Sequence, residues 1–171
     1  MKSVKKIFQD WILPIFVAII IAFIINKVVF FNVSVPTGSM LPTIHLNDKI
    51  LVTRVHNKNN LKHGDIVVFH SDELGEDLIK RLIGLPNDLV EVKEDGSVYI
   101  NNKKIDQSYV KYPGGKIGKY KVPADSYFFM GDNRINSLDA RYWQKPYIPE
   151  KDIMGKARII ISPFGRFGKL K

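Results

Sequence analysis

The sequence predicts a mainly β protein in which an N-terminal transmembrane helix precedes one domain of antiparallel sheets. Residues 11–25 form an unbroken apolar run, WILPIFVAIIIAFII. From residue 32 onward, short β-branched and aromatic stretches alternate with Gly, Pro, Asn and Asp, and no long stretch has the 3.6-residue apolar period of a helix. In a chain of 171 residues, the part after position 31 is long enough for a single hydrophobic core.

The apolar run is expected to be the centre of a membrane anchor that covers residues 7–31. The run alone is shorter than the about 20 residues that cross a bilayer, so the prediction also depends on apolar residues 7–8 and 28–31. A cleavable secretory signal is the alternative. Residues 26–31 are bulky and contain no small-residue cleavage site, which favours an uncleaved anchor.

Positive charges before the apolar run predict the orientation of the chain. Lys2, Lys5 and Lys6 stand at the N-terminus, and positively charged flanks tend to stay in the cytoplasm. We therefore expect a single-pass protein of the cell membrane, with residues 1–6 cytoplasmic and residues 32–171 forming an extracytoplasmic domain.

Composition limits the partners and the possible chemistry. The chain has no cysteine, which excludes disulfides, thiol nucleophiles and thiolate metal sites. We expect neither a cofactor nor a metal. The formal net charge of +9 suits either nucleic acid or an anionic bilayer. Because the sequence has an apolar segment and no nucleic-acid-binding motif, a lipid bilayer is the expected partner and nucleic acid is not.

The region after the apolar run contains eight expected strands. The clearest signal is a hairpin around Asp95-Gly96, a dipeptide that can adopt the positive φ angles of a tight turn. Residues 111–121, with Pro113-Gly114-Gly115 inside, are expected to form an exposed basic loop. Little helix is expected outside the membrane. The expected strands are residues 33–36, 49–55, 65–70, 78–83, 89–93, 97–100, 126–130 and 157–161.

A hydroxyl-bearing segment, PTGSMLPT at residues 36–43, closely follows the apolar run. Its Ser39 follows a glycine between two prolines, and a serine becomes a nucleophile only when a base removes its proton. Histidine is the first base to consider, but the motif Gly-x-Ser-x-Gly is absent. Each histidine also lies among polar residues or at an expected strand end, which disfavours a histidine base. These histidines are His45, His56, His63 and His70.

Lysine is the other candidate base, because burial among apolar groups lowers its pKa. In the stretch LIKRLI at residues 78–83, strand alternation puts Lys80 on the face of Leu78 and Leu82, and Arg81 on the opposite face. Alternation allows only one of these two cations to point into a core, and arginine cannot act as a base. The competing interpretation is that both are polar residues of an edge strand.

Four blocks occur in order after the apolar run: PTGSMLPT, then GDIVVF at residues 64–69, KRLIGLPND at residues 80–88 and GDNRINSLDAR at residues 131–141. Together with the N-terminal segment, they resemble the bacterial type I signal peptidases, membrane-anchored serine proteases with a serine/lysine dyad. The chain is similar to the short, single-anchor form of that family. Ile135 and Ala140 depart from residues common in the last block, at positions that carry no proposed chemistry.

The resemblance implies a signal-peptidase-like catalytic domain with Ser39 as nucleophile and Lys80 as general base. It also implies an oxyanion hole built from the backbone N–H of Ser39 and the hydroxyl of Thr37. The implied activity is removal of N-terminal signal peptides from exported preproteins, with cleavage after small residues. Since Lys80 must be neutral to act, activity is expected to rise with pH.

Three further residues match supporting positions of the family. Ser137 matches a serine that hydrogen-bonds and orients the lysine, while Asp139 and Arg141 match a supporting ion pair. The implied partners are signal-peptide-bearing preproteins and the bilayer, and we expect a monomer. Met40, next to the serine, is expected either to rest in the membrane interface or to fill a gap in the core.

Two other functions fit parts of the pattern. Self-cleaving repressors of the DNA-damage response use a serine/lysine dyad on a related β-fold, but they need a DNA-binding helical domain where this chain has an apolar segment. A membrane-anchored β-domain that binds ligands without catalysis would keep the fold. It would have no need of Ser39, Lys80 and Ser137 together.

Overall fold

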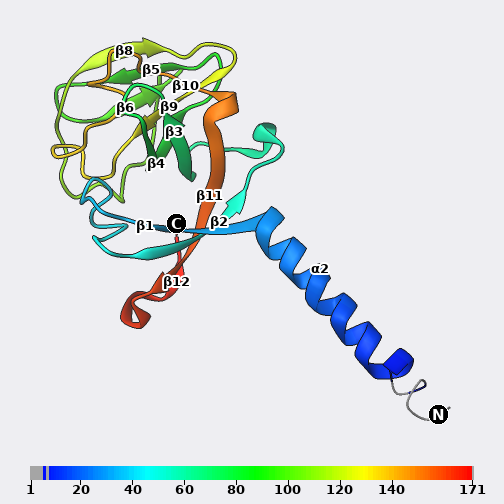
Figure 1. Cartoon of the computed structure of the whole chain (residues 1–171). Helices are drawn as coiled ribbons and strands as arrows, with labels where there is room; N and C mark the ends of the chain where they lie inside the picture. The colour runs from blue at the N-terminus through cyan, green and yellow to red at the C-terminus, as the bar shows by residue number, and fades with distance from the viewer. Residues whose placement is uncertain (1–5, 7, 171) are drawn as a thin grey trace. The chain divides into compact units, whose positions relative to one another are not determined.

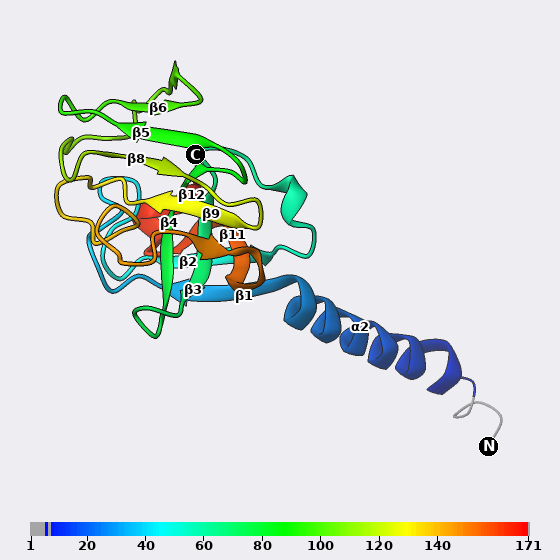
Figure 2. The same cartoon turned by 90° about the horizontal axis from the view of Figure 1, so that it is seen from above.

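The computed structural model describes residue 6 and residues 8–170, and the chain separates into two compact units between Phe31 and Asn32. Figure 1 shows the chain from the blue N-terminal helix to the red C-terminal strand, and Figure 2 shows the same structure from above. Helix forms the first unit, and strands form the second. Residues 1–5 of the predicted cytoplasmic segment and Ile7 of the predicted anchor lie outside the described residues.

Helix fills most of the predicted anchor. The π-helix η1 covers Phe8–Ile12, and the α-helix α2 covers Leu13–Val29. Among the described residues, no helix combines the length and the apolar composition that a membrane crossing requires. Phe30 and Phe31, the last two residues of the predicted anchor, belong to the first compact unit but lie in strand β1, where aromatic residues are favoured.

The second unit contains an eight-stranded sheet with the order β1-β2-β11-β3-β4-β9-β10, and β12 pairs with β11 at one side. Strands β2, β11, β3, β4, β9 and β10 pair antiparallel in that order, as predicted. The strands are β1 Phe30–Ser34, β2 Lys49–Arg54, β3 Ile66–Ser71, β4 Glu76–Gly84, β9 Ser126–Met130, β10 Ile148–Pro149, β11 Ile153–Ser162 and β12 Gly168–Lys169.

A smaller sheet has the order β7-β6-β5-β8. The hairpin predicted around Asp95-Gly96 joins β5 to β6, and Gly96 has the positive φ angle, 77°, that the turn requires. The predicted basic loop 111–121 is wrong at its end, because its last residues form β8 against β5. The strands are β5 Leu89–Val92, β6 Val98–Ile100, β7 Lys103–Lys104 and β8 Gly118–Lys121.

Outside the first unit, helix is confined to short 3₁₀ turns in the described chain, as predicted. These are η2 Lys58–Asn60, η3 Glu150–Asp152 and η4 Phe164–Arg166. The two-residue strands β7, β10 and β12 were not expected, because two residues are too few to show an alternation pattern. Strand β9 has the predicted bounds, whereas β4 begins earlier than predicted and β11 extends further at both ends.

One hydrophobic core combines side chains from both sheets. Phe69 of β3 and Phe129 of β9 stack with their ring centroids 4.3 Å apart, and the valines of β5 belong to the same cluster. Gly84, at the end of β4, allows this close approach. A Cβ there would lie 2.7 Å from Val90 Cγ2 and 2.8 Å from Val122 Cγ2, distances that no real side chain tolerates.

Candidate active site

The segment that carries Ser39 is a compact turn closed by backbone hydrogen bonds. The N–H of Val35 donates to Asp48 O at 3.1 Å, and the N–H of Asn47 donates back to Val35 O at 2.8 Å. Met40 and Ile44 are fully buried under the turn. Met40 is therefore a core residue, and the alternative that it rests in a membrane interface is wrong. Burial of these side chains holds Ser39 in one position.

Strand β4 supplies the lysine from the middle of the large sheet. It pairs with β3 on one edge and with β9 on the other, so the edge-strand interpretation is wrong. Leu82 and Ile83, which point to opposite faces, are both buried, so both faces of the strand are covered there. Lys80 is only 3% exposed and Arg81 only 2%. The expectation that alternation would bury just one of them is also wrong, because a strand covered on both faces buries both sets of side chains.

Lys80 and Ser39 meet directly. Lys80 Nζ lies 2.6 Å from Ser39 Oγ, across 41 positions of sequence, and both residues are buried. Burial lowers the pKa of Lys80 from 10.5 to about 8, against a smaller opposing effect from the charges of Asp139 and Glu76. No carboxylate forms an ion pair with Lys80 within the described part of the chain, so a neutral amine is accessible near pH 8.

The hydroxyl of Thr37 completes the immediate surroundings of the serine. Thr37 Oγ1 lies 3.3 Å from Ser39 Oγ, and it is the only described side chain besides Lys80 within hydrogen-bond distance of that atom. A hydroxyl can donate to an oxygen that develops charge. Thr37 and Lys80 are therefore the two described side chains that contact the Ser39 hydroxyl.

Asp139 and Arg141 form a buried, bidentate ion pair. Arg141 Nε donates to Asp139 Oδ1 and its Nη2 to Oδ2, both at 2.8 Å, and neither side chain is exposed. Asp139 Oδ2 also accepts the N–H of Gly131 at 2.9 Å, and Arg141 donates to the carbonyl of Arg134 at 2.7 Å. The pair therefore braces the loop of residues 131–141 from inside.

Ser137 lies in the same loop but does not make the implied bond to Lys80. Its Oγ is buried and has no hydrogen-bond partner among the residues that the structure describes. It lies against Gly131, where a Cβ would come within 2.6 Å of Ser137 Cβ and 2.5 Å of Ser39 O. A glycine at position 131 is thus what allows this loop to touch the serine turn.

A second buried ion pair, absent from the sequence-based site, links β4 to the serine turn. Arg81 Nε donates to Asp132 Oδ1 at 2.8 Å, and its Nη2 donates to Oδ2 at 2.6 Å. Thr43, at the far end of the serine turn, donates its hydroxyl to Asp132 Oδ2 at 2.5 Å. Tyr109 covers the guanidinium of Arg81, with the ring centroid 3.9 Å from Cζ.

Asn133 makes two hydrogen bonds to the segment around Ser39 that were not predicted from the sequence. Its backbone N–H donates to Ser39 O at 3.0 Å, and its side-chain Nδ2 donates to Gly38 O at 3.1 Å. The block GDNRINSLDAR was the available signal, since it carries Asp132, Asn133 and Arg134 beside the residues that received roles. A sequence pattern cannot tell which of these polar residues reaches back to the serine.

Two neighbouring hollows open beside the dyad. The larger, of about 410 Å³, is lined on one side by the serine turn and on the other by alternate residues of β4, Glu76, Leu78 and Lys80. The smaller, of about 250 Å³, lies between residues 33–37 and the same part of β4, and it has an apolar lining that includes Val68 and Ile79. Lys80 lines both hollows.

The four histidines do not serve the serine. His63 contacts Asp88 at 2.7 Å, and His70 contacts Asp77 at 2.9 Å, a hydrogen bond that raises the pKa of His70. Neither these two nor His45 and His56 bond to Ser39 in the described chain. The expectation that histidine is not the base therefore agrees with the geometry.

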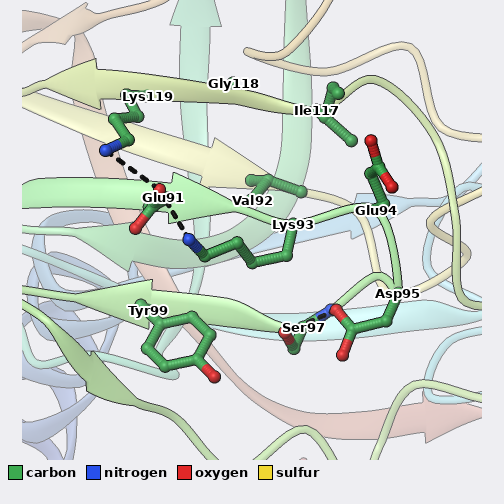
Figure 3. A pocket seen from close by; sticks show the side chains of 10 residues that line it. All are labelled: Glu91, Val92, Lys93, Glu94, Asp95, Ser97, Tyr99, Ile117, Gly118 and Lys119. Atoms are coloured by element: carbon green, nitrogen blue, oxygen red, sulfur yellow. Dashed lines mark hydrogen bonds and ion pairs between the residues drawn. The ribbon is translucent and has the colours of Figure 1, made fainter.

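A hollow of about 620 Å³ lies elsewhere, on the small sheet (Figure 3). Glu91 of β5 pairs there with Lys93 at 2.8 Å and with Lys119 of β8 at 3.1 Å. These contacts raise the pKa of Lys93 and lower that of Glu91. The one serine in its lining, Ser97, donates its hydroxyl to Asp95 at 2.6 Å. Both lysines of this lining therefore pair with Glu91, and Ser97 bonds to a carboxylate and not to a lysine.

The chain is similar to signal peptidases along most of its length. The family model described as "Signal peptidase, peptidase S26" matches residues 8–162. A signal peptidase I of Leptolyngbya laminosa is 40% identical over 146 residues, which cover 80% of this chain and 70% of that protein. Signal peptidase I P of Bacillus subtilis subsp. natto is 35% identical over 182 residues, covering 99% of this chain and 97% of the relative.

A solved structure extends the comparison to the fold. The crystal structure of a signal peptidase I from Enterococcus faecalis V583 superposes with a TM-score of 0.50 at 29% sequence identity, covering 57% of this chain and 96% of the other. The antiparallel sheets are thus those of a signal-peptidase-like fold. With a family model that matches most of its length and relatives aligned from end to end, the chain belongs to the S26 signal peptidases and is a serine endopeptidase of the bacterial type I class.

Proposed function

We propose that this chain is a membrane-anchored endopeptidase that removes signal peptides with a Ser39/Lys80 dyad. The observation that carries the proposal is the 2.6 Å contact between Ser39 Oγ and the amine of Lys80, which is buried and has a pKa of about 8. Such an amine is a base of useful strength near neutral pH, because a substantial fraction is unprotonated. Among the described serines, Ser39 is the one whose hydroxyl contacts a lysine amine.

In the proposed reaction, neutral Lys80 takes the proton of Ser39 as Oγ attacks the carbonyl carbon before the cleavage site. The oxyanion forms beside the backbone N–H of Ser39 and the hydroxyl of Thr37. The C–N bond then breaks, and the leaving amine receives the proton that Lys80 holds. A water, deprotonated by the same lysine, hydrolyses the ester and returns Ser39 to its starting state.

The supporting residues keep this arrangement rigid in the proposal. Asp139 and Arg141 brace the loop that meets the serine turn, which is consistent with their complete burial. Ser137 is proposed to orient the lysine on the strength of the family resemblance alone, since its Oγ has no hydrogen-bond partner among the described residues. One chain supplies every residue of this site, so we propose that a monomer is sufficient.

The proposed substrate is a preprotein whose signal peptide is embedded in the same bilayer as the enzyme. Helix α2 carries exposed apolar side chains between Leu13 and Phe23 and at Val28, which supports anchoring by residues 7–31. The lysines at the N-terminus support a catalytic domain on the extracytoplasmic side. Anchoring both partners raises their effective concentration. The small apolar hollow beside Lys80 supports a preference for small residues before the cut.

The test is cleavage of an exported precursor by Ser39→Ala and Lys80→Ala variants of the full chain in detergent. Both variants are expected to lose cleavage to the limit of detection. Ser97→Ala and Lys93→Ala remove the same groups from the small sheet and should retain normal activity. Normal cleavage by either dyad variant would refute the proposed dyad.

A further inference from the structure

Asn133 holds the peptide bonds on both sides of Ser39. Its side-chain Nδ2 donates to Gly38 O at 3.1 Å, and its backbone N–H donates to Ser39 O at 3.0 Å. It follows β9 in a loop that Gly131 brings against the serine turn, and its side chain lines the groove beside the dyad. Nothing in the proposed reaction so far uses this side chain.

The bond to Gly38 acts on the nucleophile through peptide geometry. The carbonyl of Gly38 and the N–H of Ser39 belong to one planar, trans peptide unit, so the two groups point in opposite directions. The carbonyl is held by two donors, Asn133 Nδ2 and the N–H of Leu41 at 3.2 Å. Fixing the carbonyl therefore fixes the direction of the Ser39 N–H.

The Ser39 N–H is available for a ligand. Among the described residues, no acceptor lies within hydrogen-bond distance of it, although Ser39 is buried. Buried backbone donors are nearly always paired, so an unpaired one beside a nucleophile marks a place where an oxygen atom is to be bound. Hydrogen bonds to the carbonyl of the same peptide also polarise it and strengthen its N–H as a donor.

The orientation of the Asn133 amide follows from its neighbour. A carbonyl oxygen only accepts hydrogen bonds, so the amide nitrogen must face Gly38 O. The other amide atom, Oδ1, is buried and has no partner among the described residues. An unpaired buried acceptor reduces stability, which indicates that the side chain is kept for the bond that Nδ2 makes.

From this geometry we infer that Asn133 is a positioning residue of the oxyanion hole, which holds the Gly38–Ser39 peptide so that its N–H meets the tetrahedral intermediate. The inference rests on the proposed Ser39/Lys80 reaction and adds to it. It assigns to a side chain outside the dyad a contribution that exists only when the oxyanion forms. It also explains why the loop of residues 131–141 must touch the serine turn.

Three variants of the full chain in detergent test the inference kinetically. Asn133→Ala deletes the bond, Asn133→Asp keeps the shape but replaces the donor with an acceptor, and Asn60→Ala removes an exposed amide of η2 that lies outside the lining of the groove and makes no side-chain hydrogen bond in the described chain. We expect kcat for precursor cleavage to fall about tenfold in Asn133→Ala and at least as far in Asn133→Asp, as for one lost hydrogen bond. KM and the acid limb of the pH profile should not change, and Asn60→Ala should match the wild type.

Inhibition separates an oxyanion role from general loosening of the site. A peptide aldehyde with the residues before the cleavage site adds to Ser39 and forms an oxyanion, whereas the corresponding peptide alcohol binds without one. Asn133→Ala should weaken the aldehyde about tenfold and leave the alcohol unchanged. Equal weakening of both, or wild-type kcat in Asn133→Asp, would overturn the inference. Absence of aldehyde addition to the wild-type enzyme would instead refute Ser39 as nucleophile, so the two failures are distinguishable.

Discussion

Two lysines on neighbouring sheets, Lys80 of β4 and Lys93 beside β5, experience opposite environments. Lys80 is buried against Ser39 Oγ without a carboxylate in contact, and its pKa falls to about 8. Lys93 is exposed in the hollow of Figure 3 and bonds to Glu91 at 2.8 Å, and its pKa rises. The hollow on the small sheet therefore contains Lys93, whose charged form is favoured. The two smaller hollows beside Ser39 contain Lys80, whose neutral form is accessible.

The difference indicates that burial without an ionic partner, and not the size of the neighbouring cavity, lowers the pKa of a lysine. Desolvation disfavours the charged amine, whereas an adjacent carboxylate favours it. Arg81, the buried cation next to Lys80, differs from it because its guanidinium pairs with the carboxylate of Asp132. One strand thus carries a charged structural cation and a lysine prepared to lose its proton.

The largest expected effect comes from replacing each lysine with arginine. Arginine keeps the positive charge but cannot be deprotonated, so it cannot act as a base. Lys80→Arg should lower kcat/KM for precursor cleavage by about 10³-fold, in line with the contribution of a general base. Lys93→Arg, which keeps the pair with Glu91, should stay within about twofold of the wild type. Substantial activity in Lys80→Arg would contradict the contrast between the two lysines.

The two carboxylates that pair with cations should differ in their contribution to stability. Asp132→Ala removes the carboxylate that pairs with the buried Arg81 and accepts the hydroxyl of Thr43. The free energy of unfolding should therefore fall by about 3–5 kcal/mol. Urea unfolding followed by circular dichroism measures this. Glu91→Ala removes a partly buried carboxylate whose two lysine partners are exposed, and it should leave the urea midpoint almost unchanged. Equal urea midpoints for the two variants would show that the buried Arg81–Asp132 pair contributes no more to stability than the pairs of Glu91.

A smaller effect is expected from the hydroxyl beside the serine. Thr37→Val keeps the shape of the side chain and removes one oxyanion donor, so kcat should fall about a hundredfold, corresponding to about 3 kcal/mol. Thr53→Val is the matched control, because Thr53 lies on β2 and its hydroxyl bonds to Lys156 O at 3.3 Å. Unchanged kcat in Thr37→Val would remove this residue from the oxyanion hole.

The sequence was sufficient for most of the strands and for the meeting of Ser39 with Lys80, because alternation, turn residues and four ordered blocks are local signals. The sequence was insufficient where the burial of a residue depends on which other parts of the chain pack against its strand. Alternation cannot reveal that β4 is covered on both faces, so the burial of Arg81 was missed. The contacts of Asp132 and Asn133 with the serine turn connect residues about 90 positions apart, and no local pattern encodes them. The two-residue strands are likewise invisible to pattern analysis.

The most direct test of the dyad is the pH dependence of kcat/KM for cleavage of one precursor by the wild-type enzyme. Only neutral Lys80 can accept the proton of Ser39, and its pKa is about 8. Activity should therefore rise about tenfold per pH unit below pH 8 and level off above it. A profile that stays flat from pH 6 to 9, or one that keeps rising toward the ordinary lysine value of 10.5, would contradict a desolvated Lys80 as the base.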